Sequence, residues 1–182
     1  MGRIDIIVYS IIPEVSSADR LVEAVGEYCL LRGIMPVDFI VERTESKPYI
    51  RGISGLECSV SHSGALWTCA FSDRPVGVDV EKEKEANFPG ISGRFFHPSE
   101  NIWLSGTGYT DFFSIWTAKE SYVKRLGTGI ADGFSEFSVA DGNGLLRYVN
   151  GSELRHIPLE KGYRMCVCAE IIDEVFIHDR RK

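Results

Sequence analysis

Between residues 36 and 81 the chain has four short β-type segments in succession, with no helical pattern between them. They read PVDFIVER, ECSVSH, LWTCAFS and VGVDVE, and each is rich in the β-branched or aromatic side chains typical of strands. The tetrapeptide SDRP between the last two segments predicts a tight hairpin. Strands that follow one another in this way favour antiparallel pairing and limit the folds open to the chain.

Helical and further strand patterns flank this region. The apolar run at residues 4–12 predicts a strand, and a helix is expected from a cap at Ser16 or Ser17 to a stop at Gly33 and Pro36. After a charged stretch with Pro and Gly, a short helix with a turn and then a longer helix are expected, and strands follow them. The charged stretch is 82–93, the helices are 94–106 and 110–127, and the strands are 134–140, 145–149, 154–159 and 163–171.

Each half of the chain therefore has one or two helices and several antiparallel-type strands, which predicts an α+β fold. The 182 residues suffice for one domain of ordinary size or for two small lobes that share a core. The stretch 82–93 is the best candidate for a junction. We therefore expect an N-terminal lobe at 1–83 and a C-terminal lobe at 84–182.

Composition and charge argue against several classes of protein. The formal net charge of -6 argues against binding of nucleic acid or anionic membrane through net charge alone. The apolar run at 4–12 is too short to span a bilayer and lacks the basic flank and cleavage site of a signal peptide, so we expect a cytoplasmic protein. The five cysteines show no disulfide spacing and no zinc signature, and are expected to be reduced, mostly buried thiols.

The segment VGVDVE places Val76, Val78 and Val80 on one face of a strand and Asp79 and Glu81 on the other. The simplest interpretation is that the acidic face meets solvent. The alternative is that the two carboxylates, roughly 7 Å apart along the strand, reach one metal ion. Oxygen ligands of this kind favour Mg²⁺ or Mn²⁺ over zinc.

The helix expected at 110–127 carries charges where apolar side chains belong. On a helical wheel Lys119 falls inside the apolar arc with Trp116, and Glu120 and Lys124 fall at its edge. Lys119 could extend past its neighbours to solvent, and Glu120 with Lys124 could be an ordinary i,i+4 pair. Because an unpaired buried charge is costly, a nearby ion or anion is the sharper interpretation. The opposite, polar face is formed by Thr117, Ser121 and Arg125.

Two further segments have residues suited to phosphate. In SVSHSG, His62 ends a strand between Ser61 and Ser63, where free backbone amides can contact an anion, although a single histidine is usually structural. In KPYIRG, Lys47 precedes a proline that stiffens the following turn. His97 and His156 have no motif context. His178 lies in a charged tail, HDRRK, that is expected to be solvated.

Together these segments resemble the larger, pseudo-dimeric type of 4'-phosphopantetheinyl transferase. In order, the motifs are KPYI at Lys47, SHSG at Ser61, VGVDVE at Val76 and WTAKESYVK at Trp116. The third resembles the family's G-x-D-x-E pattern and the fourth its W-x-x-K-E-x-x-x-K pattern, and RFFHPSE and GYRMCVCA are also similar. Each motif alone is weak, whereas the ordered set is specific.

The resemblance implies two similar α+β lobes related by a pseudo-twofold axis, with coenzyme A bound in the cleft between them. It further implies that Asp79, Glu81 and Glu120 hold Mg²⁺, or Mn²⁺ in its place, on the pyrophosphate of the coenzyme. Longer relatives have an additional basic helix near the N-terminus that helps to bind the 3'-phosphate, so recognition of that phosphate is an open question here. The residues implied to contact coenzyme A and its phosphates are Lys47, Ser61, His62, Arg20 and either Lys119 or Lys124.

The implied activity is transfer of the 4'-phosphopantetheine arm of coenzyme A to a serine hydroxyl of an apo acyl or peptidyl carrier protein, with release of 3',5'-ADP. Glu120 or a metal-bound water would accept the serine proton, and Lys124 would orient Glu120 and stabilise developing charge. Two alternatives are a non-catalytic binder of coenzyme A or a nucleotide, and a metal-dependent phosphohydrolase that uses the same acids. A monomer without nucleic acid or membrane partners is expected, and the sequence does not identify the carrier protein.

Overall fold

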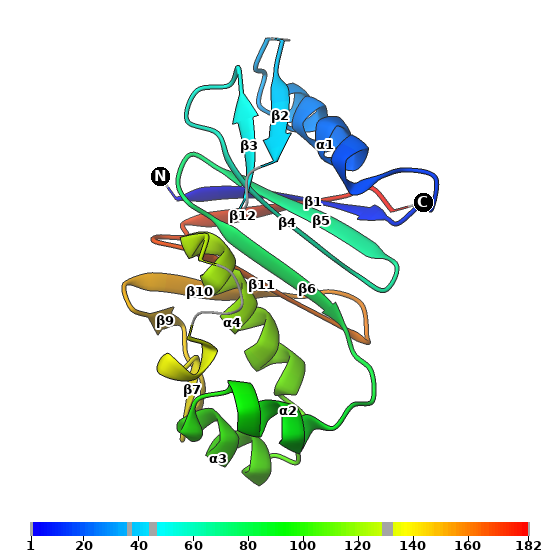
Figure 1. Ribbon diagram of the computed structural model, residues 1–182. Helices are drawn as coiled ribbons and strands as arrows, with labels where there is room; N and C mark the ends of the chain where they lie inside the picture. The colour runs from blue at the N-terminus through cyan, green and yellow to red at the C-terminus, as the bar shows by residue number, and fades with distance from the viewer. Residues whose placement is uncertain (1, 36–37, 44–46, 129–132, 182) are drawn as a thin grey trace.

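The computed structural model describes residues 2–35, 38–43, 47–128 and 133–181, and it has the α+β composition expected from the sequence (Figure 1). Pro36, the expected helix stop, lies outside the described residues, as does the start of the segment 36–43. The helices are α1 (Ser17–Leu31), α2 (Phe88–Phe95), α3 (Pro98–Gly106), α4 (Phe112–Leu126) and a 3₁₀ turn (Phe134–Glu136). The strands are β1 (Arg3–Ser10), β2 (Ile40–Arg43), β3 (Pro48–Arg51), β4 (Glu57–Ser63), β5 (Leu66–Ser72), β6 (Gly77–Lys82), β7 (Ala140–Asp141), β8 (Gly144–Leu145), β9 (Tyr148–Val149), β10 (Ser152–Ile157), β11 (Tyr163–Ala169) and β12 (Glu174–Asp179).

The first of two four-stranded sheets has the order β12-β1-β5-β4. The tail expected to be solvated, 178–182, begins within strand β12, which pairs in parallel with β1. Its His178 contacts the buried Asp5 through Nε2, 2.9 Å from Oδ1. The expectation of a solvated tail was therefore wrong for His178, whereas Asp179 and Arg180 are exposed as expected.

The second sheet has the order β6-β11-β10-β9 and is antiparallel throughout. Strands β5 and β6 therefore belong to different sheets, and the hairpin predicted at SDRP is wrong. The tight hairpin lies one connection earlier, between β4 and β5, where Gly64 has a φ of +59° that favours glycine. The SDRP segment instead carries the chain from one sheet to the other, because Val76, Val78 and Val80 pack between the sheets.

Two short strands form a separate pair near the first sheet. The proline of KPYI, expected to stiffen a turn, instead begins β3, which pairs with β2 in antiparallel register. A proline is tolerated at the first position of a strand because it has no N–H to donate to the ladder.

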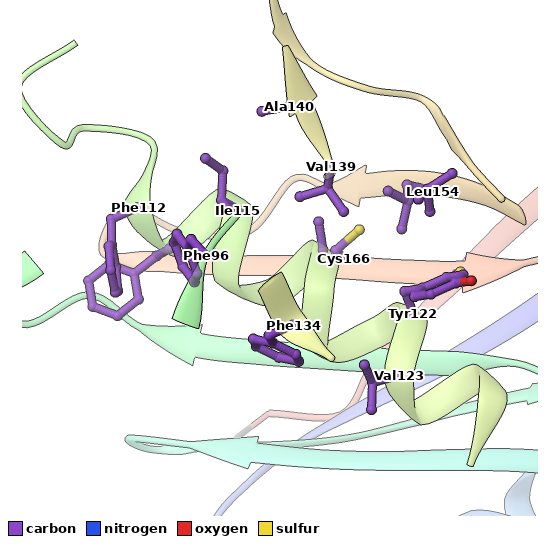
Figure 2. Close-up of a cluster of buried hydrophobic side chains, with 14 of the residues drawn as sticks. Phe96, Phe112, Ile115, Tyr122, Val123, Phe134, Val139, Ala140, Leu154 and Cys166 are labelled. Atoms are coloured by element: carbon purple, nitrogen blue, oxygen red, sulfur yellow. The ribbon is translucent and has the colours of Figure 1, made fainter. Parts of the chain in front are cut away.

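The two sheets stack between two helices, with α1 outside the first sheet and α4 outside the second (Figure 1). One apolar cluster lies under α1, a second lies between the sheets, and a third joins α4 to the second sheet and to α2 and α3. Figure 2 shows the third cluster, to which α4 contributes Phe112 and the 3₁₀ turn contributes Phe134. Cys166 and Cys168 belong to this cluster, and all five cysteines are free and buried, as expected.

Helix α4 is buried on nearly all sides, so the polar face predicted for it does not meet solvent. Thr117 and Ser121 are fully buried. Their hydroxyls donate to carbonyl oxygens of the helix itself, Thr117 to Phe113 and Ser121 to Ala118, each at 2.9 Å. Because each hydroxyl has a hydrogen-bond acceptor within the helix, its burial leaves no unsatisfied polar group.

Strands cross the expected lobe boundary in both directions. Strand β6, before residue 83, belongs to the sheet of β11, and β12, near the C-terminus, belongs to the sheet of β1. The division into lobes at 1–83 and 84–182 therefore does not match the division of strands between sheets, and it stays a prediction. Among the described residues, none of the helices is long and apolar enough to cross a membrane.

Candidate active site

Strand β6 and helix α4 bring acidic and basic side chains together. Along β6, alternation directs Val78 and Val80 between the sheets. Asp79 and Glu81 therefore point to the other face, which α4 covers. One turn of α4 adds Glu120 and Lys124, four residues apart on the same side of the helix. The site thus gathers side chains that are distant in the sequence, as the motifs predict.

Asp79 is the most tightly held carboxylate of this cluster. Its Oδ1 accepts a hydrogen bond from the Ser61 hydroxyl at 2.7 Å and pairs with the Lys124 ammonium at 2.6 Å. Its other oxygen, Oδ2, is buried and has no hydrogen-bond partner among the described residues. A buried carboxylate oxygen without a partner is costly, so this atom is suited to a cation.

Glu81 and Glu120 complete the acidic set. Glu81 accepts a hydrogen bond from the Ser63 hydroxyl at 2.7 Å. Glu120 is only 5% exposed, and burial, with the nearby charges of Asp79 and Glu81, raises its pKa to about 7 despite the opposing effect of Lys124. Burial also raises the pKa of Asp79 and of Glu81. The charge of Asp79 also raises the pKa of Glu81, and the charges of Asp79 and Glu81 raise that of Glu120, so added positive charge would stabilise the ionised set.

The donor set fits a hard divalent cation better than zinc, because all three candidate ligands are carboxylates. Among the described residues, however, no group of three His, Cys, Asp or Glu side chains has an arrangement that could hold a metal ion as it stands. The positive charge next to Asp79 is the Lys124 ammonium. Lys124 thus contacts Asp79, whereas the sequence led us to expect it to orient Glu120.

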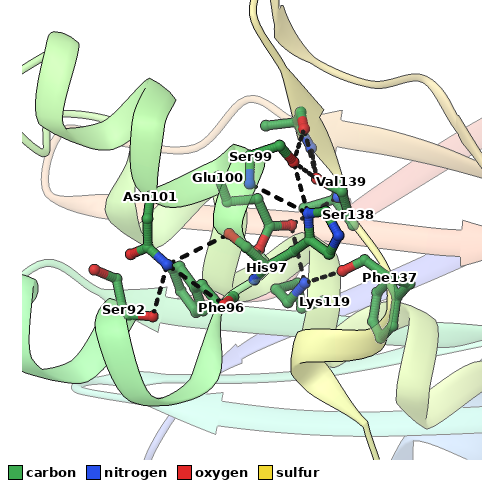
Figure 3. A network of polar contacts seen from close by, with 11 residues as sticks. Ser92, Phe96, His97, Ser99, Glu100, Asn101, Lys119, Phe137, Ser138 and Val139 are labelled. Atoms are coloured by element: carbon green, nitrogen blue, oxygen red, sulfur yellow. Dashed lines mark hydrogen bonds and ion pairs between the residues drawn. The ribbon is translucent and has the colours of Figure 1, made fainter.

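Lys119 does not reach this cluster. It is fully buried, and its ammonium pairs with Glu100 of α3 at 2.9 Å and donates to the carbonyl of Phe137 at 2.6 Å (Figure 3). The same Glu100 accepts from the N–H groups of His97 and Val139, so it also caps α3. Sequence reasoning missed Glu100, although His-Pro-Ser-Glu has the spacing of a capping box.

Lys47 also lies away from the carboxylates. Its ammonium donates to the carbonyls of Arg125 at 2.9 Å and Val76 at 3.2 Å. It therefore links the start of β3 to the C-terminal end of α4 and the start of β6. A cation near the last carbonyls of a helix is favourable because those oxygens carry the negative end of the helix dipole.

A pocket of about 180 Å³ brings together two of the residues expected to contact phosphate, Arg20 and His62. Arg20 is 8% exposed and stacks over the ring of Tyr9, 4.7 Å from its centroid. Its Nη1 pairs with Glu23 at 2.6 Å, while its Nη2 is buried without a hydrogen-bond partner among the described residues. His62 is exposed. A guanidinium with an unused donor beside an exposed imidazole suits an anion.

A second pocket, of about 160 Å³, has Glu81 of the acidic cluster in its lining. Phe112, Phe113, Trp116 and Lys84 also line it. Trp116, interpreted from the sequence as core, is half-buried: it packs against the α4 cluster and also lines this pocket. The acidic cluster therefore lies beside an aromatic surface.

The remaining serines and histidines are placed as follows. Ser61 is buried and its hydroxyl donates to Asp79, so it belongs to the carboxylate cluster rather than to the Arg20 pocket. Ser63 was missed as a site residue, although strand alternation puts it on the same face as Ser61. His97 caps α3, and burial lowers the pKa of His156.

Comparisons with known proteins agree with the motifs. The sequence profile of the 4'-phosphopantetheinyl transferase superfamily matches residues 75–168. The chain is 34% identical to a 4'-phosphopantetheinyl transferase of Bacillus subtilis over 133 residues, which is 68% of this chain and 59% of the relative. It is 33% identical to 4'-phosphopantetheinyl transferase psf-1 of Bacillus pumilus over 146 residues, or 74% of this chain and 62% of the relative.

A third relative matches a shorter region. Over 76 residues the chain is 41% identical to 4'-phosphopantetheinyl transferase gsp of Aneurinibacillus migulanus, which is 40% of this chain and 32% of the relative. The matched region thus spans less than two thirds of the length of each of these three relatives.

Proposed function

The chain belongs to the 4'-phosphopantetheinyl transferase superfamily, and from this premise we propose that it transfers the 4'-phosphopantetheine arm of coenzyme A to a serine of an apo acyl or peptidyl carrier protein. The observation that carries this proposal is the gathering of Asp79, Glu81, Glu120 and Lys124, in which the buried Oδ2 of Asp79 has no hydrogen-bond partner within the described part of the chain. Such a cluster would hold a cation that offsets the negative charge of the diphosphate of coenzyme A.

In the proposed reaction the serine hydroxyl oxygen attacks the β-phosphorus of coenzyme A. The new bond joins this oxygen to phosphorus, the bond that breaks is that between the β-phosphorus and the bridging oxygen of the diphosphate, and 3',5'-ADP leaves with that oxygen. The hydroxyl proton passes to a base. Catalysis of such a transfer consists mainly of positioning and of stabilising charge.

Asp79, Glu81 and Glu120 would hold Mg²⁺, or Mn²⁺ in its place. When bound, the ion would supply positive charge that offsets the charge of the diphosphate. The buried Oδ2 of Asp79 supports this assignment, because its other oxygen already has two partners.

Glu120 is the proposed proton acceptor. Its pKa of about 7 keeps a fraction of the carboxylate available near neutral pH and strong enough to take a proton from an attacking hydroxyl. Lys124, which pairs with Asp79, adds positive charge next to the transferred phosphoryl group.

Coenzyme A is proposed to reach from the Arg20 and His62 pocket to the pocket lined by Glu81. The Arg20 and His62 pocket supplies a guanidinium donor and an imidazole for phosphate, and the aromatic pocket at Glu81 supplies apolar surface for the pantetheine arm or the carrier protein. The two sheets, each covered by one helix, support the proposal that two similar lobes related by a pseudo-twofold axis enclose the ligand. The monomeric state and cytoplasmic location stay predictions.

The test is incubation of a panel of apo acyl and peptidyl carrier proteins with the protein, coenzyme A and Mg²⁺, followed by mass spectrometry. A gain of one phosphopantetheine arm on a carrier is expected. Glu120→Gln and Asp79→Ala are expected to slow transfer by about 100-fold or more, the usual contribution of a proton acceptor or charge-stabilising group. Glu170→Gln, at an exposed carboxylate distant from the cluster, is the control.

Three outcomes would contradict the proposal. Near-normal transfer by both site variants would show that these carboxylates are not the reacting groups. Binding of coenzyme A in calorimetry without transfer to any carrier would favour a non-catalytic binder. Release of 3',5'-ADP without a carrier protein would favour a phosphohydrolase.

A further inference from the structure

Strands β4 and β6 lie side by side without a backbone ladder between them, since β4 pairs with β5 and β6 pairs with β11. Side chains of β4 take the place of that ladder. The N–H groups of Val78, Val80 and Lys82 donate to serine hydroxyls at 3.0, 3.2 and 3.1 Å. The accepting residues, which we call the serine row, are Ser59, Ser61 and Ser63.

Two members of the serine row have a second contact. A serine hydroxyl has one hydrogen and two lone pairs, so an oxygen that accepts an N–H still has its hydrogen to donate. The Ser61 hydroxyl donates to Asp79, and the Ser63 hydroxyl donates to Glu81, both at 2.7 Å. In each case the carboxylate belongs to the residue directly before the N–H that the serine accepts. Each serine therefore binds the backbone of β6 and the neighbouring carboxylate together.

Resting on the function proposed above, we propose that Ser61 and Ser63 are positioning residues that orient Asp79 and Glu81 toward a divalent cation. The Ser61 hydroxyl and the Lys124 ammonium both engage Oδ1 of Asp79, which leaves Oδ2 buried and without a partner among the described residues. Ser63 likewise donates a hydrogen bond to Oε2 of Glu81 and does not engage Oε1. Hydrogen bonds to carboxylate ligands from such partners set the ligand orientation and tune metal affinity.

Ser59 provides a matched control within the serine row. Its hydroxyl accepts the N–H of Val78 at 3.0 Å, as its neighbours accept theirs. The residue before Val78 is Gly77, which has no side chain to orient. Loss of the Ser59 hydroxyl therefore removes the same kind of hydrogen bond between strands without touching a carboxylate.

The experiment measures Mn²⁺ binding by calorimetry on the full chain, with and without coenzyme A and without a carrier protein, next to thermal unfolding. Ser61→Ala and Ser63→Ala are expected to weaken Mn²⁺ binding by roughly 10- to 100-fold, the usual effect of removing such a partner. Ser59→Ala is expected to lower the unfolding midpoint comparably but to keep Mn²⁺ affinity within about twofold, because it orients no ligand. Ser63→Thr, which keeps a hydroxyl, is expected to restore most of the affinity.

The outcomes separate this role from the transferase function. The positioning role is overturned, whatever the transfer assay shows, by any of three results. Ser61→Ala and Ser63→Ala leave the Mn²⁺ affinity unchanged, all three alanine variants lower it equally, or the unaltered chain does not bind Mn²⁺. Serine-dependent Mn²⁺ binding in a chain that modifies no carrier supports the role and contradicts the transferase function. If Ser61→Ala does not fold, the Mn²⁺ affinities of Ser63→Ala and Ser63→Thr, at a half-buried position, test the positioning role.

Discussion

At the scale of single residues, Glu120 shows a conflict between stability and function. Its carboxyl is 5% exposed, and its pKa rises from 4.5 to about 7. An acid whose folded pKa is raised destabilises the fold when it ionises: the cost is absent below pH 4.5 and fully present above pH 7. A difference of this size corresponds to roughly 3 kcal/mol.

Glu120→Gln is therefore expected to stabilise the metal-free protein at pH 8 by up to roughly 3 kcal/mol, with little effect near pH 4.5. Denaturant unfolding at the two pH values in the presence of a chelator measures this. Glu170→Gln should change neither. A destabilised Glu120→Gln variant at pH 8 would mean that the carboxylate has a favourable partner in the metal-free state.

Lys119 and Glu100 form a buried ion pair, which predicts a strong coupling between them. Lys119→Met leaves the Glu100 carboxylate buried without its cation and is expected to cost roughly 3–5 kcal/mol. The double variant Lys119→Met with Glu100→Gln removes both charges and should recover part of this loss. Denaturant unfolding of the two single variants and the double variant gives the coupling energy, with Lys161→Met at an exposed site as the control. Additive effects would contradict a direct pair.

At the scale of elements, the close approach of β6 to α4 sets the geometry of the site. A Cβ on Gly77 would lie 1.9 Å from the carbonyl oxygen of Ser121 and 2.5 Å from the backbone nitrogen of Arg125. Gly77→Ala must push the strand and helix apart, and overpacking of this kind costs roughly 1–3 kcal/mol or more. Gly26→Ala, in α1 with nothing within 4 Å of its Cβ, should instead stabilise by roughly 0.5–1 kcal/mol.

Thermal unfolding of both glycine variants tests this contrast, and the transfer assay adds a second readout. Displacement of β6 from α4 separates Asp79 from Lys124, so Gly77→Ala should also lose activity at temperatures where it is still folded. A Gly77→Ala variant as stable and active as the unaltered chain would show that the two elements are not in contact as described.

Most elements could be predicted from the sequence, because their apolar residues repeat with a clear period and their ends can be identified; these are α1, β4, β5, β6 and α4. What each face of an element contacts could not be predicted. The wheel assigned Thr117 and Ser121 to a polar surface, since hydropathy does not record hydroxyls that bond to their own helix. It placed Lys119 correctly on a buried face, but the partner Glu100 lies in another helix, and its capping-box spacing does not indicate a pairing with Lys119.

At the scale of the whole molecule, the acidic cluster was predictable and the sheet topology was not. The family resemblance placed Asp79, Glu81 and Glu120 at one site, whereas the period of each element indicated only which way its own side chains face. Sheet membership depends on which edge of a strand is hydrogen-bonded, and residue pattern does not encode this: SDRP reads like a hairpin but joins two sheets. The serine row escaped notice for the same reason, since its partners lie on β6.

Strand β12 pairs with β1, which brings the C-terminal strand next to the N-terminal one, and the buried Asp5 lies in this pairing. Burial alone would raise the pKa of Asp5, but hydrogen bonds from Arg3, His178 and Arg32 outweigh it and lower the pKa below 3.8. An acid with a lowered folded pKa contributes stability that is fully present well above pH 3.8 and is lost as the pH falls through the folded pKa. Asp5 should therefore hold the two ends of the described chain together at neutral pH.

Asp5→Asn is expected to lower stability at pH 7 by roughly 1.5–3 kcal/mol, the usual worth of hydrogen bonds to a charged group. The difference from the unaltered chain should shrink as the pH falls from 3.8 through the folded pKa of Asp5, because below that pKa both proteins have a neutral side chain at this position. Thermal unfolding of both proteins from pH 7 downward measures it, and Asp73→Asn at an exposed turn is the control. A difference that stays constant with pH would mean that Asp5 acts through its shape and neutral hydrogen bonds. In that case the junction between β1 and β12 would depend on backbone pairing rather than on charge.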